Sequence, residues 1–187
     1  LAAASEPTKT IILVGIYAGL RVRSEALTLK KADIDFQRRT LTVQAAHAKN
    51  GETKTVPISS ELFAPLKLQM KRSKSEYVFV KEDGITPLKE IKTAFYAACR
   101  RANLKDVTPH VLRHTFASRL VMKGADLRTV QELGGWKSIS MVERYSHLSD
   151  RHKAEAVELI GRKNFTTLFT TRGNSESAEF PQVVENK

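Results

Sequence analysis

The order of hydrophobic and polar positions along the chain predicts a mainly helical domain with one short β region. Residues 10–20 form a continuous apolar run, which is typical of a helix buried in a core, and Gly19 favours a turn at its end. Ser24 is a suitable N-cap for a second short helix directly after that turn. Further helices are expected over residues 61–71, 88–103, 108–120 and 126–133, and from about 150 to 160.

Strict alternation of apolar and polar residues marks the β region. Residues 40–44 and 53–58 alternate, and the segment 49–52 between them has the composition of a turn. Residues 33–35 lead into this region, and residues 77–80 have the composition of a further brief strand. The predicted class is therefore α+β, mainly α-helical with a small antiparallel β-sheet.

The helix over residues 108–120 combines a buried face with a cationic one. Thr108 is a good N-cap, and Pro109 suits the first helical position because its missing N–H would have no partner there. His110 and Arg113 share a face near the helix N-terminus, where free N–H groups and the helix dipole favour an anion. Residues at i, i+4 and i+8 form the stripe expected to face the core: Leu112, Phe116 and Leu120.

The next segment is a short amphipathic helix over residues 126–133. Asp126 is its expected N-cap, and Gly134 and Gly135 form a helix stop. Trp136 follows, and after a polar turn a second short helix is expected to carry Tyr145. Because its neighbourhood is the most polar and cationic, Tyr145 is predicted to have a reachable phenol. Three other tyrosines are predicted to be core or half-buried packing residues: Tyr17, Tyr77 and Tyr96.

These residues carry a resemblance to a known family. The run HVLRHTFASRL, the LGGW turn and a Tyr nine residues after Trp136 resemble the C-terminal catalytic domain of the tyrosine recombinases, the phage-integrase family. The resemblance covers residues 11–159 and implies the DNA breaking-rejoining fold of that domain. It implies six catalytic residues: Arg21, Lys49, His110, Arg113, Trp136 and Tyr145.

Two of these assignments leave an alternative open. Arg21 follows Gly19-Leu20 as the family pattern requires, but Glu25 stands one residue later than is usual, so Arg23 competes for the role of first arginine. Lys49 matches the hairpin lysine of the family, and Lys54 is the nearest rival.

The resemblance also implies a chemistry that suits these residue types. Two guanidiniums, Arg21 and Arg113, would hold the phosphate oxygens, because arginine stays charged and binds such oxygens in pairs. Tyr145 would attack the phosphate, His110 would exchange its proton, and Lys49 would protonate the departing 5′ oxygen. Trp136 would position the phosphate. The phosphotyrosyl ester stores the energy of the broken bond, so no metal ion, ATP or other cofactor is expected.

The same resemblance implies the partners and the organisation of the chain. The partner is double-stranded DNA carrying attachment sites, bound by a homo-tetramer that is a monomer without DNA, with accessory DNA-bending proteins. Residues 1–163 would be the catalytic domain of a prophage or mobile-element integrase, with its N-terminal DNA-clamping domain missing. Residues 164–187 would be a flexible tail that docks on a neighbouring subunit. The start at Leu1 in an Ala-rich stretch indicates a fragment or a processed chain.

Composition supports a polyanionic partner. The 187 residues carry 31 Lys and Arg against 20 Asp and Glu, a net charge of +11, and the excess lies in the predicted domain rather than in the tail. The single cysteine, Cys99, excludes an internal disulfide or a multi-cysteine zinc site and is expected to be buried. No apolar run approaches 18 residues and no signal-peptide pattern is present, so a location in the bacterial cytoplasm with the nucleoid is expected, with no membrane partner.

Three other functions are compared with this prediction. His110 and His114 have the spacing of a zinc-protease helix, but no Glu follows the first His and no third ligand is evident. His114 is instead expected to pack or to form a hydrogen bond behind the site. A type IB topoisomerase and a non-catalytic DNA-binding protein are the remaining alternatives.

Overall fold

The first helix and the turn after it lead to Arg21, the first residue of the predicted site. The computed structural model describes residues 1–49 and 51–149. Helix α1 (Thr8–Tyr17) is confirmed in the apolar run, and the chain then turns at Gly19 with φ +66°. A Cβ on Gly19 would lie 2.5 Å from the Phe116 ring, so only glycine fits this close approach. The next turn is a π-helix, η1 (Val22–Ala26); Ser24 lies inside it, and its prediction as an N-cap is wrong.

The sheet is antiparallel with three strands in the order β1 (Ile34–Asp35), β2 (Thr40–Val43) and β3 (Lys54–Pro57). Strand β2 pairs with β3 in a register that sets Val43 opposite Lys54. The predicted strand over residues 77–80 is wrong, because that segment forms only isolated bridges. Val78, Phe79 and Val80 are nevertheless buried, so they contribute to the core without pairing in a sheet.

The remaining α-helices follow the predicted order, and two short 3₁₀-helices within the described residues were not predicted. Together they are η2 (Lys31–Asp33), α2 (Ser60–Arg72), α3 (Lys92–Arg101), α4 (Pro109–Met122), α5 (Leu127–Gly134), α6 (Ser140–Glu143) and η3 (Ser146–Ser149). Helix α3 begins four residues later than predicted. At the start of α4, Thr108 has the extended backbone of an N-cap, but its side chain makes no capping hydrogen bond. At the start of α5 the predicted cap is confirmed, since Asp126 accepts a hydrogen bond from the backbone N–H of Thr129 at 2.9 Å.

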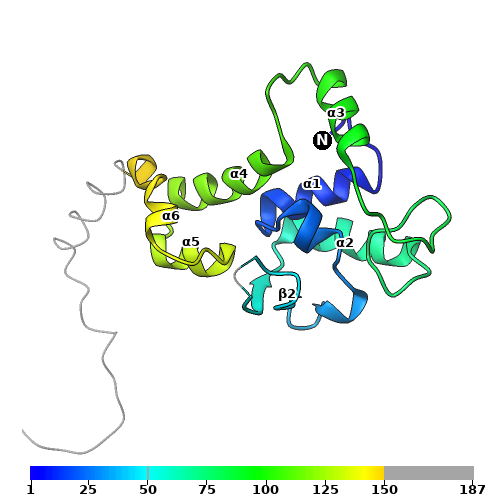
Figure 1. Ribbon diagram of the computed structural model, residues 1–187, viewed down its shortest axis with the longest axis horizontal. Helices are drawn as coiled ribbons and strands as arrows, with labels where there is room; N and C mark the ends of the chain where they lie inside the picture. Colours follow the sequence, from blue (N-terminus) through cyan, green and yellow to red (C-terminus); the bar gives the residue numbers. More distant parts are fainter. Residues whose placement is uncertain (50, 150–187) are drawn as a thin grey trace, which may run out of the picture. The chain divides into compact units, whose positions relative to one another are not determined.

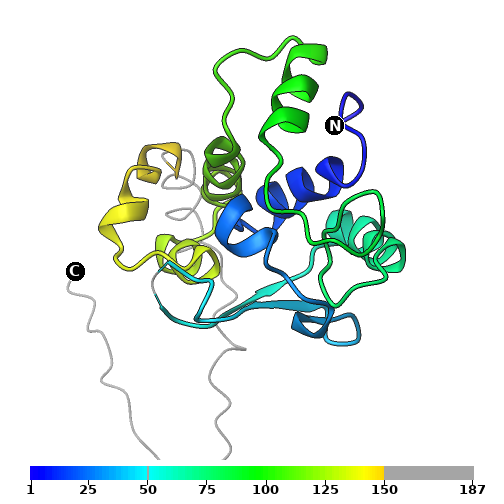
Figure 2. The same cartoon turned by 45° about the vertical axis from the view of Figure 1, so that its right-hand side comes forward.

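Two hydrophobic clusters divide the interior. The large cluster includes α1, the sheet, α2 and α3, and α1 packs against both α2 and α4 (Figure 1). The small cluster is formed by Ala117, Val121, Val130, Val142 and Tyr145. Helix α4 contributes to both clusters, and the hairpin end of β3 approaches α5 (Figure 2). The site lies where these elements meet.

Several predictions concern individual side chains. Cys99 is buried, as predicted, and Tyr96 is 37% exposed, with its ring packed edge-on against Phe95. The predicted helix from about residue 150 and the predicted tail lie outside the described residues. None of the helices within residues 1–49 and 51–149 combines the length and apolar character needed to cross a bilayer.

Candidate active site

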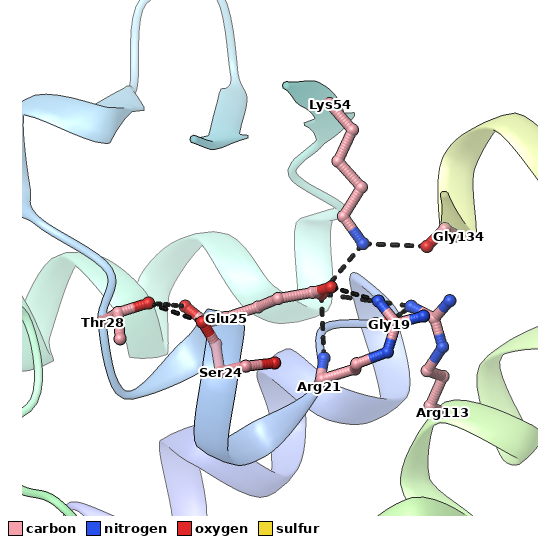
Figure 3. A network of polar contacts seen from close by, with 8 residues as sticks. All are labelled: Gly19, Arg21, Ser24, Glu25, Thr28, Lys54, Arg113 and Gly134. Atoms are coloured by element: carbon pink, nitrogen blue, oxygen red, sulfur yellow. Dashed lines mark hydrogen bonds and ion pairs between the residues drawn. The ribbon is translucent and has the colours of Figure 1, made fainter. Parts of the chain in front are cut away.

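A buried carboxylate, Glu25, forms the centre of the site. Its side chain has no exposed surface. Arg21 donates from Nη1 to Glu25 Oε1 at 2.5 Å and from its backbone N–H to Oε2 at 3.0 Å. Lys54 Nζ donates to Oε2 at 3.0 Å, and Arg113 Nη1 lies 4.0 Å from the same oxygen (Figure 3). We call Arg21, Glu25, Lys54 and Arg113 the charge cluster.

The charge cluster holds three cations on one anion. Burial opposes the ionisation of Glu25, but the charges of Lys54 and Arg113 and the hydrogen bonds outweigh it, and the pKa of Glu25 lies below its ordinary value. The carboxylate is therefore ionised at neutral pH. Sequence reasoning noted Glu25 only as part of a family motif. Glu25 follows two arginines, Arg21 and Arg23, and an apolar run in the sequence, and this pattern could have predicted a buried ion pair.

Arg21 reaches the charge cluster because the turn after α1 directs it there. It is the N-cap of η1 and is 18% exposed, whereas Arg23 is an exposed residue of the same turn. Of the two arginines that compete for the first position, the structure brings Arg21 to Glu25.

Lys54 enters the charge cluster from the sheet. It stands two residues before the buried Val56 in β3, so both side chains lie on the inner face of the sheet. Its Nζ also donates to the carbonyl of Gly134 at 2.9 Å. Burial lowers the pKa of Lys54 to about 8, even though Glu25 opposes that shift. Lys49, the predicted hairpin lysine, is exposed.

Arg113 is buried on α4. Its Nη1 donates to the carbonyl of Gly19 at 2.7 Å, and its guanidinium lies 4.0 Å from the centre of the Trp136 ring, a cation–π contact. Burial lowers the pKa of Arg113 to about 10, so it remains charged at neutral pH. Its Nη2 is a buried donor with no hydrogen-bond partner among the described residues. Such a donor is costly unless an acceptor reaches it.

The glycines before Trp136 fix the position of its indole. Gly135 caps α5 with φ +68°, a left-handed conformation that suits glycine. A Cβ on Gly134 would lie 1.7 Å from the Trp136 ring, so the ring packs directly over the backbone of Gly134. The centres of the Trp136 and Tyr145 rings are 6.4 Å apart. Trp136 therefore contacts both Arg113 and Tyr145.

Tyr145 is buried, and its prediction as a reachable phenol is wrong. Only 6% of the residue is exposed, and it lies in the turn after α6 rather than on the helix. Its hydroxyl oxygen is 2.5 Å from Nδ1 of His114, so this histidine forms a hydrogen bond, as one of its two predicted roles required, but within the site rather than behind it. Burial raises the pKa of Tyr145, although Arg144 and Arg113 act in the opposite direction. The phenol is therefore neutral until a base takes its proton.

His110 lies nearer to the solvent. It is exposed, and it lines a surface groove of about 760 Å³ together with Arg21. Within the described part of the chain, the imidazole that forms a hydrogen bond with the Tyr145 hydroxyl is that of His114. Residues 1–49 and 51–149 contain no group of three or more His, Cys, Asp or Glu side chains arranged to hold a metal ion.

The arrangement suits an anion with several oxygens. The guanidiniums of Arg21 and Arg113 converge on Glu25, and Arg113 keeps an unpaired donor. The indole of Trp136 packs on the Arg113 guanidinium and also contacts the phenol ring of Tyr145. Of the six residues predicted for the site, the structure brings together Arg21, Arg113, Trp136 and Tyr145. It leaves His110 at the rim and Lys49 exposed, and it adds Glu25, Lys54 and His114.

Comparison with known proteins gives a consistent result. The model of the phage integrase family matches residues 1–152. The integrase of Salmonella phage P22 is 34% identical over 167 residues, which cover 83% of this chain and 43% of the phage protein. The tyrosine recombinase XerA of Pyrococcus furiosus is 36% identical over 157 residues, covering 80% of this chain and 53% of that protein.

The fold agrees with the sequence comparison. The catalytic domain of bacteriophage HP1 integrase superposes with a TM-score of 0.62 at 28% identity, covering 83% of each chain. This chain spans about half the length of the curated relatives it matches. Since the family model covers most of the chain, the chain belongs to the phage integrase family.

Proposed function

We propose that this chain is the catalytic part of a site-specific DNA recombinase, a prophage or mobile-element integrase. It would cleave and rejoin DNA through a covalent 3′-phosphotyrosyl intermediate. Membership of the phage integrase family supports this function, and the net charge of +11 is suited to DNA.

The observation that carries the proposal is the state of Arg113. This guanidinium is buried and charged, and it keeps one unpaired donor, Nη2. A non-bridging oxygen of a DNA phosphate would satisfy that donor. The neighbouring guanidinium of Arg21 would bind the other non-bridging oxygen, so the pair would stabilise the extra negative charge of the phosphorane transition state.

Tyr145 would be the nucleophile in this mechanism. Its oxygen would form the bond to phosphorus while the bond from phosphorus to the 5′ oxygen breaks, which leaves a 3′-phosphotyrosine and a 5′-hydroxyl. The cations Arg113 and Arg144 favour the phenolate that develops during attack. Trp136 would hold Arg113 and Tyr145 in their relative positions through its ring contacts with both.

A lysine would protonate the departing 5′ oxygen. Lys49 is the residue that matches the family pattern, and its exposed position at the hairpin would let it approach bound DNA. Lys54 is the alternative, since its amine already lies in the charge cluster with a pKa of about 8. A lysine with that pKa gives up a proton readily near neutral pH.

We extend the proposal to the assembly. The enzyme would act as a homo-tetramer on two DNA attachment sites, would be a monomer without DNA and would use accessory DNA-bending proteins. It would work in the bacterial cytoplasm. Residues 1–163 would form the catalytic domain, and residues 164–187 would dock on a neighbouring subunit; a truncation after Lys163 that left assembly on DNA unchanged would argue against that docking.

A nicked suicide DNA duplex carrying candidate attachment sequences would test the proposal. The wild-type chain should form a covalent adduct, visible on a denaturing gel without metal ion or ATP, and the Tyr145→Phe variant should form none. Binding without an adduct would indicate a non-catalytic DNA-binding protein. Relaxation of supercoiled plasmids that lack any defined site would indicate a topoisomerase.

A further inference from the structure

The contact between His114 and Tyr145 identifies a further candidate catalytic residue. We propose that Nδ1 of His114 accepts the proton of the Tyr145 hydroxyl when the tyrosine attacks DNA. The inference rests on the proposed function. It assigns the proton to an imidazole other than His110, the one that the resemblance implies.

The geometry carries this assignment. His114 Nδ1 and the Tyr145 hydroxyl oxygen are 2.5 Å apart, and the centres of the two rings are separated by 6.1 Å. His114 directly follows Arg113 on α4, so one turn of helix offers a guanidinium to the charge cluster and an imidazole to the nucleophile. A neutral imidazole that carries its proton on Nε2 has a free lone pair on Nδ1 and accepts from the phenol. A candidate base must lie within hydrogen-bond reach of the proton it takes, and His114 meets that requirement.

The charges around this pair favour the transfer. Burial, followed by the charges of Arg144, His110 and Arg113, lowers the pKa of His114, so the imidazole is neutral at physiological pH and able to accept. Arg144 and Arg113 also face Tyr145, where they favour the phenolate. His114 is exposed overall whereas Tyr145 is buried, so the imidazole can pass the proton on to water.

The step balances in both directions. In cleavage the hydroxyl O–H bond of Tyr145 breaks, its proton moves to His114 Nδ1 and its oxygen bonds to phosphorus. The bond from phosphorus to the 5′ oxygen breaks, and that oxygen takes a proton from the lysine acid. In rejoining, a 5′-hydroxyl attacks phosphorus and returns a proton to that lysine, and the His114 imidazolium protonates the leaving tyrosine.

Substitution of His114 on two DNA substrates would test the proposal. In the His114→Asn variant a side-chain oxygen can replace Nδ1 as a hydrogen-bond acceptor but cannot take a proton, so positioning is kept and basicity is lost. The second substrate carries sulfur in place of the departing 5′ oxygen, and a thiolate leaves without a proton. Loss of the base should slow adduct formation by about 100-fold or more on both substrates. Loss of the lysine acid should slow it on the oxygen substrate alone.

The pH profile supplies a readout that a positioning role would not change. The wild-type rate should fall as the pH drops through the pKa of His114, which lies below the ordinary 6.5, and this fall should disappear in His114→Asn although His110 is intact. The exposed His147 offers a matched control, and His147→Asn should keep the wild-type rate and profile. Circular dichroism and DNA binding at wild-type levels would establish that the His114 variant is folded.

Two results would overturn the inference alone. One is a His114→Asn rate within about threefold of wild type, and the other is recovery of that variant on the sulfur substrate. A wild-type chain that forms no adduct on any candidate site, as part of the full-length protein, would overturn the proposed function and this inference together.

Discussion

Removal of the Glu25 charge should destabilise the domain strongly. The Glu25→Gln substitution keeps the shape of the side chain but leaves Arg21, Lys54 and Arg113 without their shared buried anion. Loss of one partner of a buried ion pair costs about 3–5 kcal/mol. For a domain of this size we expect the melting temperature to fall by roughly 10 °C, at about 2–4 °C per kcal/mol.

A matched control exists on the surface. Arg128 and Glu132 form an ion pair with the same four-residue spacing as Arg21 and Glu25, at 2.7 Å, but their side chains are 72% and 63% exposed. Exposed pairs of this kind contribute about 0.2–1 kcal/mol, so Glu132→Gln should change the melting temperature by no more than about 4 °C. Thermal unfolding followed by circular dichroism compares both variants with wild type. Equal shifts for the two variants would refute the reasoning that Glu25 offsets the buried cations.

The effect of Glu25→Gln should also depend on pH. Because the pKa of Glu25 is lower in the folded protein than its ordinary 4.5, its carboxylate stabilises the fold above that value, and the stabilisation is lost as the pH falls through the folded pKa. The difference between wild type and Glu25→Gln should therefore shrink in acid. A difference that stayed constant from pH 7 to pH 3 would show that the charge is not the cause.

Three further predictions concern the site. Lys49→Met should slow adduct formation by about 100-fold on ordinary DNA, and its rate should recover on DNA that carries sulfur in place of the departing 5′ oxygen. If the Lys54→Met variant recovers on the sulfur substrate instead, Lys54 is the acid. Gly134→Ala should destabilise the fold by about 1–3 kcal/mol, because its Cβ would overlap the Trp136 ring, and should shift the fluorescence of this single tryptophan; an unchanged spectrum would contradict that packing. DNA binding should weaken by at least about tenfold between 50 and 200 mM salt, since phosphate contacts dominate it, and a flat titration would argue against such contacts.

Local signals in the sequence predicted the elements that carry the site. Thr108-Pro109 located the start of α4, and Asp126 with the two glycines located both ends of α5, because caps and stops act within a few residues. The alternating segments gave β2 and β3 for the same reason. The fold class followed from these elements and is confirmed.

Tertiary packing decided the features that were missed. The polar neighbours of Tyr145 in the sequence indicated an exposed phenol, but the side chain packs into the small cluster against residues of α4 and α5, which its own neighbours do not reveal. Lys54 had a signal that could have been used, since strand alternation puts it on the face of Val56. The segment Tyr77–Val80 has strand composition without a neighbouring strand to pair with, so composition alone predicted it wrongly.

The two hydrophobic clusters differ in size, and Tyr145 and the charge cluster are held by different ones. Glu25 is fixed between elements packed on the large cluster, whereas Tyr145 belongs to the small one, which has five buried members among the described residues. Local opening requires less free energy where fewer apolar contacts are broken. In the proposed reaction, Tyr145 would therefore be withdrawn or presented while the cations paired with Glu25 keep their positions, which would separate the timing of cleavage from the binding of the phosphate.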